Sequence, residues 1–209
     1  TLFPYTTLFR SSLDRTNWSA RKNEVNLLVL SVCMGDVAVP LFWTDLGYKG
    51  NSNTGQRKRI ILRFAEVFGY EKILCLTADR EFVGKDWFLW LQKKRIPYVV
   101  RLRNNFKVRT SGGHETEVCN LFRNLKIRGE RCLGEKKICG ATHVLSAIRL
   151  PGNEFVILVS AGIEAQSAGD WYSVRWNIET GFEKLKSHGF HFEESRLSGA
   201  GKYELMLAG

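Results

Sequence analysis

The sequence predicts an α/β fold with a mixed β-sheet and flanking helices. Short apolar runs rich in β-branched residues alternate with segments of helical periodicity, the pattern of sheets that carry helices on their faces. Hydrophobic residues make up 44% of the 209-residue chain and aromatic residues 12%. That content supports a buried core and excludes a disordered chain. The length fits one domain, or one domain with a sizeable insertion.

Three strands are expected first. Residues 12–17 form the end of a strand that carries Asp14. The run at 25–34, VNLLVLSVCM, is almost continuously apolar and suits a central strand covered on both faces. Gly35-Asp36 is a tight turn, and residues 37–44 return as the second arm of a hairpin.

The first helix is expected at residues 56–68, after a loop rich in Gly, Asn and Ser at 47–55. Thr54 is in position to cap it. The apolar side chains that share its inner face are Ile60, Phe64 and Val67.

The next elements are a buried strand at 73–77 that ends at Asp79, a helix at 85–94 and a strand at 97–102. The helix turns Trp87, Phe88, Trp90 and Leu91 inward. The resulting order, β-β-β-α-β-α-β, is the beginning of a ribonuclease-H-like fold.

We divide the rest of the chain by its change of pattern. Residues 12–103 form the first part of the ribonuclease-H-like domain. Residues 104–163 consist of short β-type segments punctuated by turn residues and are expected to be a β-rich insertion. Residues 164–209 return to the domain with a long helix, which begins at Gly169 or Asp170 and reaches about Ser187.

The first eleven residues, TLFPYTTLFRS, equal the in-frame translation of a sequencing-library adaptor. We therefore treat 1–11 as non-native, and expect that both natural ends are missing. Since Arg10, Ser11 and Ser12 then stand where a central strand normally buries an aliphatic group, we expect reduced stability and activity.

The charge favours a polyanionic partner. The formal net charge is +10, and residues 101–137 hold ten cations against four Glu, which predicts a phosphate-facing surface. A solvated charged face is the alternative. The cations are Arg101, Arg103, Lys107, Arg109, Arg123, Lys126, Arg128, Arg131, Lys136 and Lys137.

The cysteines indicate a reducing cytoplasm, because their number is odd and no CxxC pair or signal peptide is present. Cys33 and Cys75 lie in apolar runs and are expected to be buried thiols. Cys132, Cys139 and His143 match no standard zinc module in spacing, so a zinc site is not expected.

On a helix spanning residues 171–186, four polar residues fall within an arc of roughly 60°. They are Tyr172, Arg175, Glu179 and Lys186. Ordinary surface ion pairs explain this arc as well as a functional site does, so helical geometry alone does not decide between them.

Asp14 and Asp79 each follow an apolar strand run, where neighbouring strands can present both carboxylates to one cleft. A carboxylate on a central strand is costly to bury without a counter-charge. With Glu179 they supply hard oxygen ligands suited to Mg²⁺ or Mn²⁺. Either Asp alone is more simply a cap or turn acid.

Four motifs, in order, resemble the DDE transposases of bacterial insertion sequences, specifically the insertion-sequence-four (IS-four) family. They are LDRTNW around Asp14, KGNSNT at 49–54, ADREFVGKDWF around Asp79, and Tyr172-x2-Arg175-x3-Glu179-x6-Lys186. The last reproduces that family's Y-R-E-K signature, and the resemblance covers residues 12–209.

The resemblance implies a DNA transposase that cleaves transposon ends and joins them to target DNA, with two Mg²⁺ ions that Mn²⁺ can replace. It implies that Asp14, Asp79 and Glu179 are the catalytic, metal-binding triad. It also implies that Tyr172, Arg175 and Lys186 bind transposon-end DNA, roles suited to a hydroxyl and two cations. The full-length protein is expected to be a homodimer in the bacterial cytoplasm, associated with the nucleoid and without a membrane partner.

The chain departs from the family pattern in one respect. Some members stack a flipped base on a Trp of the insertion, but all six Trp here lie outside 104–162. Phe106 and Phe122 are the candidates to replace it. Two other readings stay open: an inactive nucleic-acid-binding remnant of a transposase, and a two-carboxylate glycosidase, which leaves the cations without a role.

Overall fold

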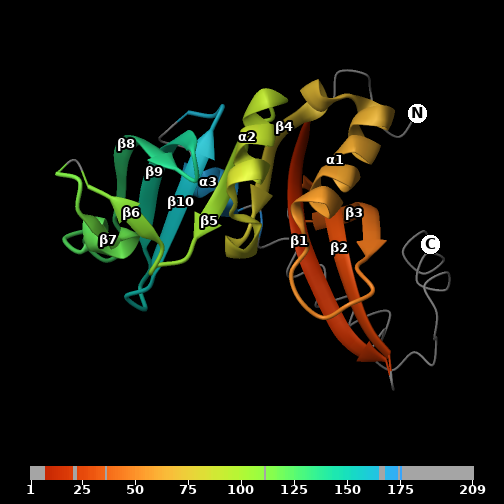
Figure 1. The fold of residues 1–209 in the computed structure, drawn as a ribbon, viewed down its shortest axis with the longest axis horizontal. Helices are drawn as coiled ribbons and strands as arrows, with labels where there is room; N and C mark the ends of the chain where they lie inside the picture. The colour runs from red at the N-terminus through yellow and green to blue at the C-terminus, as the bar shows by residue number, and fades with distance from the viewer. Residues whose placement is uncertain are drawn as a thin grey trace. The chain divides into compact units, whose positions relative to one another are not determined.

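The computed structural model describes residues 8–20, 23–35, 37–110, 112–164, 168–173 and 175 (Figure 1). Two units of structure divide the chain. Unit one comprises Thr1–Lys72 and Val174–Gly209, and unit two comprises Ile73–Ser173. Each unit builds its own part of the fold.

Unit one contains an antiparallel sheet in the order β3-β2-β1. Its strands are β1 (Phe9–Ala20), β2 (Asn23–Met34) and β3 (Val37–Asp45). The sequence prediction found all three, and residues 12–17, predicted as the end of the first strand, lie within β1. Phe9, within the stretch treated as non-native, is 3% exposed and packs edge-on against Phe64 at 5.6 Å. Ser11 and Ser12 are also buried.

Helix α1 (Thr54–Phe68) covers one face of this sheet and is followed by the 3₁₀ turn η1 (Tyr70–Lys72). The predicted cap was wrong. Asn53, not Thr54, accepts the backbone N–H of Gln56, whose side chain in turn accepts from the N–H of Asn53. Val67 was also misplaced: it is 64% exposed, and the buried positions are Arg57, Ile60, Ile61 and Phe64.

The side chain of Asn26 in β2 hydrogen-bonds to the loop between β3 and α1. Asn26 donates from Nδ2 to the carbonyl oxygens of Tyr48, at 2.6 Å, and Gly50, at 3.0 Å. Its Oδ1 accepts from Arg15 Nη1 at 2.9 Å. Asn26 is 3% exposed, so this buried amide joins β1, β2 and the loop that carries the KGNSNT motif.

Unit two contains a five-stranded mixed sheet in the order β4-β5-β10-β9-β8. Only the β4–β5 pair is parallel, and the pairs β5–β10, β10–β9 and β9–β8 are antiparallel. The strands are β4 (Ile73–Ala78), β5 (Tyr98–Leu102), β10 (Phe155–Ala161), β9 (Ala141–Arg149) and β8 (Glu130–Ile138).

Two helices cover opposite faces of this sheet (Figure 1). Helix α2 (Lys85–Lys93) stacks Phe88 on Tyr98 of β5, with ring centroids 5.5 Å apart. Helix α3 (Ala168–Ser173) packs Ala168 and Tyr172 on the face of Val99, the next residue of β5. Neighbouring strand residues point to opposite faces, so the two helices do not compete for one surface.

The remaining elements of unit two are short. Residues Arg80–Phe82 form the 3₁₀ turn η2 directly after β4. Strands β6 (Lys107–Arg109) and β7 (Glu115–Glu117) pair with each other as a separate two-stranded sheet. The 3₁₀ turn η3 (Val118–Phe122) connects them toward β8 and buries Phe122 completely.

The predicted fold class, a mixed α/β fold of the ribonuclease-H-like kind, is confirmed. Within 104–163, β8, β9 and β10 extend the sheet beyond β5, and β6 and β7 alone stand apart. The long helix predicted to reach residue 187 is described only as α3, and its later turns lie outside the described residues. Among the helices of the described part, none is long and apolar enough to cross a bilayer.

The predicted burial of two cysteines is confirmed. Cys33 is 7% exposed and Cys75 is fully buried. No group of three His, Cys, Asp or Glu side chains suited to a metal ion occurs within the described residues. His143 is 1% exposed and packs edge-on against the stacked rings of Phe88 and Tyr98, so it serves the packing of α2.

Candidate catalytic and DNA-binding site

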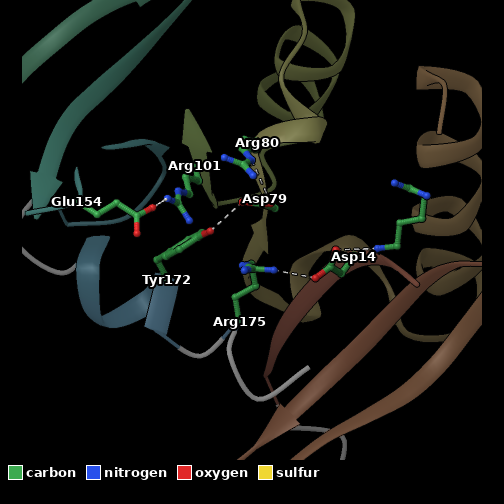
Figure 2. Close-up of polar contacts among 8 residues, drawn as sticks. Asp14, Asp79, Arg80, Arg101, Glu154, Tyr172 and Arg175 are labelled. Carbon is green, nitrogen blue, oxygen red and sulfur yellow. Dashed lines mark hydrogen bonds and ion pairs between the residues drawn. The ribbon is translucent and has the colours of Figure 1, made fainter. Parts of the chain in front are cut away.

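Asp14 lies in the middle of β1, opposite Val29 of β2. Its Oδ1 accepts the backbone N–H of Arg15 at 2.7 Å, and its Oδ2 accepts Nη1 of Arg175 at 2.7 Å (Figure 2). The Arg175 side chain is 4% exposed and that of Asp14 13%. The two therefore form a largely buried ion pair within unit one, between residues 161 positions apart in the chain.

Asp79 follows β4 directly and starts the turn η2, where its carbonyl accepts the N–H of Phe82 at 2.9 Å. Its carboxylate does not cap that turn. Oδ1 accepts the Tyr172 hydroxyl at 3.2 Å, and Oδ2 lies 4.0 Å from Nε of Arg80, a mostly exposed side chain. About a quarter of the Asp79 side chain is exposed. This carboxylate is thus oriented by neighbours but not enclosed by them.

Tyr172 reaches Asp79 because α3 fixes its ring. The ring is 2% exposed and packs among Cys75, Val99, Val156 and Leu158. Only its hydroxyl extends to the end of β4, where Figure 2 shows it pointing at Asp79. Because the packed ring is already fixed, the hydroxyl can bond Asp79 without further ordering of the Tyr172 side chain.

Arg101 was treated from the sequence only as one cation of a basic stretch. The register that pairs Ala78 with Val100 brings Asp79 and Arg101 to equivalent positions at the ends of two parallel strands. Arg101 is 17% exposed and forms an ion pair with Glu154 at 2.5 Å. The motif PYVVRL places Arg101 at the end of its strand, but the sequence does not give the strand register. Without the register, the position of Arg101 level with Asp79 could not be predicted.

The sequence-predicted site residues are therefore described in part. Tyr172 contacts Asp79, and Arg175 contacts Asp14. Glu179 and Lys186 lie outside the described residues. Phe122 is fully buried and cannot stack a base in this conformation, which leaves half-buried Phe106 as the candidate of that pair.

A profile of the transposase DDE domain matches residues 46–209. The chain belongs to the transposase DDE domain family. The match covers most of the chain, including Asp79, Tyr172 and Arg175. Members of this family use divalent metal ions. No curated protein sequence matches the chain.

Solved structures agree with the family at the level of fold. A piggyBac transposase in a synaptic complex with hairpin DNA superposes with a TM-score of 0.55 at 12% identity, over 97% of this chain and 45% of that chain. The DDE-domain chain thus spans less than half of that transposase.

Two other structures match more loosely. One is a protein of unknown function from Archaeoglobus fulgidus DSM 4304, with a TM-score of 0.43 at 16% identity, over 88% of this chain and all of that one. The other is an endonuclease V from Bacillus subtilis, with a TM-score of 0.36 at 12% identity, over 97% and 82% of the two chains.

The chemistry of the donors fits a divalent metal of the hard class. Asp14 and Asp79 offer carboxylate oxygens, the ligands that Mg²⁺ and Mn²⁺ prefer. Asp14 bonds Arg175, and Asp79 bonds the Tyr172 hydroxyl and lies 4.0 Å from Arg80, so neighbouring side chains hold both carboxylates in place.

Proposed function

We propose that this chain is the catalytic core of a DNA transposase of the insertion-sequence-four kind. In this proposal Asp14, Asp79 and Glu179 converge on divalent metal ions, two Mg²⁺ with Mn²⁺ as a substitute. Tyr172, Arg175 and Lys186 bind the transposon end. The full-length protein acts as a homodimer on bacterial nucleoid DNA.

One observation carries the proposal. The two hydrogen-bonding residues of the Y-x2-R motif each bond a different aspartate of the predicted triad: Tyr172 bonds Asp79 and Arg175 bonds Asp14. A surface helix with ordinary ion pairs gives no reason for either contact. A two-carboxylate glycosidase gives no reason for a buried guanidinium on one of its acids.

Each side chain of the proposed site has a different role in phosphodiester cleavage. Divalent ions, when bound, supply the Lewis acid that activates a water and stabilises the leaving oxygen. Tyr172 donates to one oxygen of Asp79, and the Arg80 guanidinium lies 4.0 Å from the other. Arg175 supplies a buried counter-charge to Asp14. Because its planar fork also suits phosphates, it can exchange the carboxylate for a DNA phosphate.

The chemistry proceeds in two displacements. Water attacks the phosphodiester at the transposon end and releases a 3′ hydroxyl and a 5′ phosphate. That hydroxyl then attacks a phosphodiester of target DNA and displaces a new 3′ hydroxyl. Each step breaks one P–O bond and forms another, so no oxidant or nucleotide cofactor is required.

The test is cleavage of a labelled duplex that carries the inverted repeat flanking this reading frame, with Mg²⁺ and with Mn²⁺. We expect Asp14→Asn, Asp79→Asn and Glu179→Gln each to lower the cleavage rate by at least about 100-fold, the scale lost with a key electrostatic group. Asp86→Asn is the matched control, because Asp86 is an exposed acid in the first turn of α2. A triad variant that cleaves as fast as this control contradicts the assignment.

A further inference from the structure

A tight turn at Lys126–Gly129 joins η3 to β8. The Lys126 carbonyl accepts the N–H of Gly129 at 2.9 Å, which places Ile127 and Arg128 at the corner. Arg128 has φ of +60°, a backbone region in which Gly or Asn is favoured at such a corner. Arg95, Cys139 and Asn153 also have positive φ among the described residues, so this conformation defines the corner, and the charge of the side chains carries the argument.

The turn is rigidly held. The backbone N–H of Arg128 donates to the carbonyl of Arg149 at 2.7 Å, and the N–H of Arg149 returns a bond to Gly129 at 3.0 Å. Nη1 of Arg149 also donates to the carbonyl of Leu125 at 2.5 Å. A Cβ on Gly129 would approach the Lys126 carbonyl to 2.8 Å. The backbone of the corner is thus fixed before any partner binds.

The side chains on this rigid turn are cationic and unneutralised. Arg123, Lys126 and Arg128 are exposed and form no ion pair within the described part of the chain. The next acid, Glu130, turns toward α3, since its Oε1 would lie 3.3 Å from a Cβ on Gly169. Ile127, at the corner itself, is 54% exposed. An apolar tip flanked by three cations is the result.

This turn lies at the same edge of the unit-two sheet as Asp79. The parallel pair β4–β5 ends there, and the antiparallel registers Ile157↔Leu102 and Phe155↔Arg149 carry that edge to the end of β9. Strand β8 begins at this edge, with Glu130 opposite Ile148. Four interstrand spacings of about 4.8 Å separate β4 from β8, roughly 19 Å.

We propose that the cationic turn, Arg123 with Lys126–Arg128, is a second duplex-DNA contact that grips the substrate about six base pairs from the phosphate cut at Asp79. The spacing follows from roughly 19 Å at about 3.4 Å per base pair. The assignment rests on the proposed function, because it takes duplex DNA as the substrate. Arg and Lys neutralise the backbone, and an apolar tip beside arginine suits insertion into a minor groove.

Affinity for DNA tests the contact. Fluorescence anisotropy with a labelled 30-base-pair duplex of mixed sequence compares the chain with a triple variant, Arg123→Gln, Lys126→Gln and Arg128→Gln. We expect binding to weaken by roughly tenfold at 0.1 M salt, and the slope of log K against log salt to become shallower by about three.

The matched control removes three exposed cations that precede β5 at the opposite edge of the same sheet: Lys93→Gln, Lys94→Gln and Arg95→Gln. Its net charge equals that of the first variant. Equal affinities and slopes in the two triple variants overturn the contact, because they reduce it to a general effect of charge.

A single variant separates binding from folding. Arg128→Asn suits the positive φ and removes the charge, so we expect weaker binding with an unchanged or higher melting temperature. A lower melting temperature with unchanged binding shows that Arg128 serves the fold alone and overturns the assignment.

Hydroxyl-radical protection on a duplex with the flanking inverted repeat tests the position. The turn variant should lose protection about six base pairs from the cut phosphate, and loss at another position contradicts the spacing. The variant Asp79→Asn separates the test of the proposed catalytic function from the test of the DNA contact at the turn. If it still cleaves DNA, the proposed catalytic function fails, whereas the difference between the two triple variants still reports on the turn.

Discussion

The two described acids of the candidate triad are the same residue type in opposite settings. In unit one, Asp14 lies within a strand and is closed off by the buried guanidinium of Arg175. In unit two, Asp79 lies just beyond a strand end, a quarter exposed, with the Tyr172 hydroxyl at 3.2 Å and the Arg80 guanidinium at 4.0 Å.

The difference shows that the two carboxylates need different amounts of compensation for their charge from the surrounding protein. A carboxylate inside a strand loses much of its hydration and must be compensated within the protein. A carboxylate at a strand end keeps part of its hydration and needs only orientation. Asp14 is therefore expected to depend strongly on its partner for stability, and Asp79 weakly.

Removal of the Asp14 partner should have the largest effect. Arg175→Met keeps most of the side-chain volume and leaves Asp14 without its buried counter-charge, which should lower the free energy of unfolding by about 3–5 kcal/mol. Urea denaturation monitored by circular dichroism measures it. Asp14→Asn in the same chain should recover part of the loss. A loss below about 1 kcal/mol would show that Asp14 is well hydrated and would erase the contrast with Asp79.

Acid should weaken unit two through a different buried group. Burial lowers the pKa of His143 to about 4 from its ordinary 6.5, and Nδ1 bonds the Ala141 carbonyl at 3.1 Å. Because the unfolded chain binds a proton near pH 6.5 and the folded chain does not, stability is full above pH 6.5. It is lost progressively as pH falls toward 4, by at most about 3 kcal/mol.

The control for this pH effect is His143→Phe, which keeps an aromatic ring beside Phe88 and Tyr98. Denaturation at pH 8 and at pH 5 should show a smaller difference in the variant than in the unmodified chain. Hydrogen exchange in α2 and β9 localises the effect. The same pH dependence in both proteins would assign it to another group.

Tyr172→Phe should have the smallest effect. It keeps the ring in its apolar socket and removes only the bond to the partly exposed Asp79, which should reduce the free energy of unfolding by about 1 kcal/mol or less. The same denaturation measurement checks it. A loss as large as that of Arg175→Met would mean that both acids depend equally on their partners.

Local patterns predicted the fold well. Apolar runs located β2, β4 and β5, and helical periodicity located α1 and α2. The helix cap was predicted wrongly because two neighbouring residues can fill the same role. Asn53 and Thr54 can both cap a helix, and only Gln56, three residues after Asn53, decides for the capping box.

The sequence named the candidate site residues, whose roles stay predictions, but it did not give their contacts. The motifs named Asp14, Asp79, Tyr172 and Arg175, and the structure describes all four. The pairing of Asp14 with Arg175 spans 161 positions, and Arg101 is brought level with Asp79 only by strand register. Neither fact is encoded in local periodicity, because each depends on which strands become neighbours.

The Asn26 bonds to the loop and to Arg15 bear on how β2 finds its place during folding. Strand β2 is apolar on both faces, since Leu27, Leu28, Val29 and Leu30 are all buried. A slip of one residue against β1 would therefore cost little in hydrophobic contact, although it inverts every side chain. The slip would carry Asn26 to the other face, away from Arg15 and the loop carbonyls it bonds. The hydrogen bonds of one amide side chain thus favour the native register of the β1–β2 hairpin over shifted registers that hydrophobic contacts alone would not disfavour.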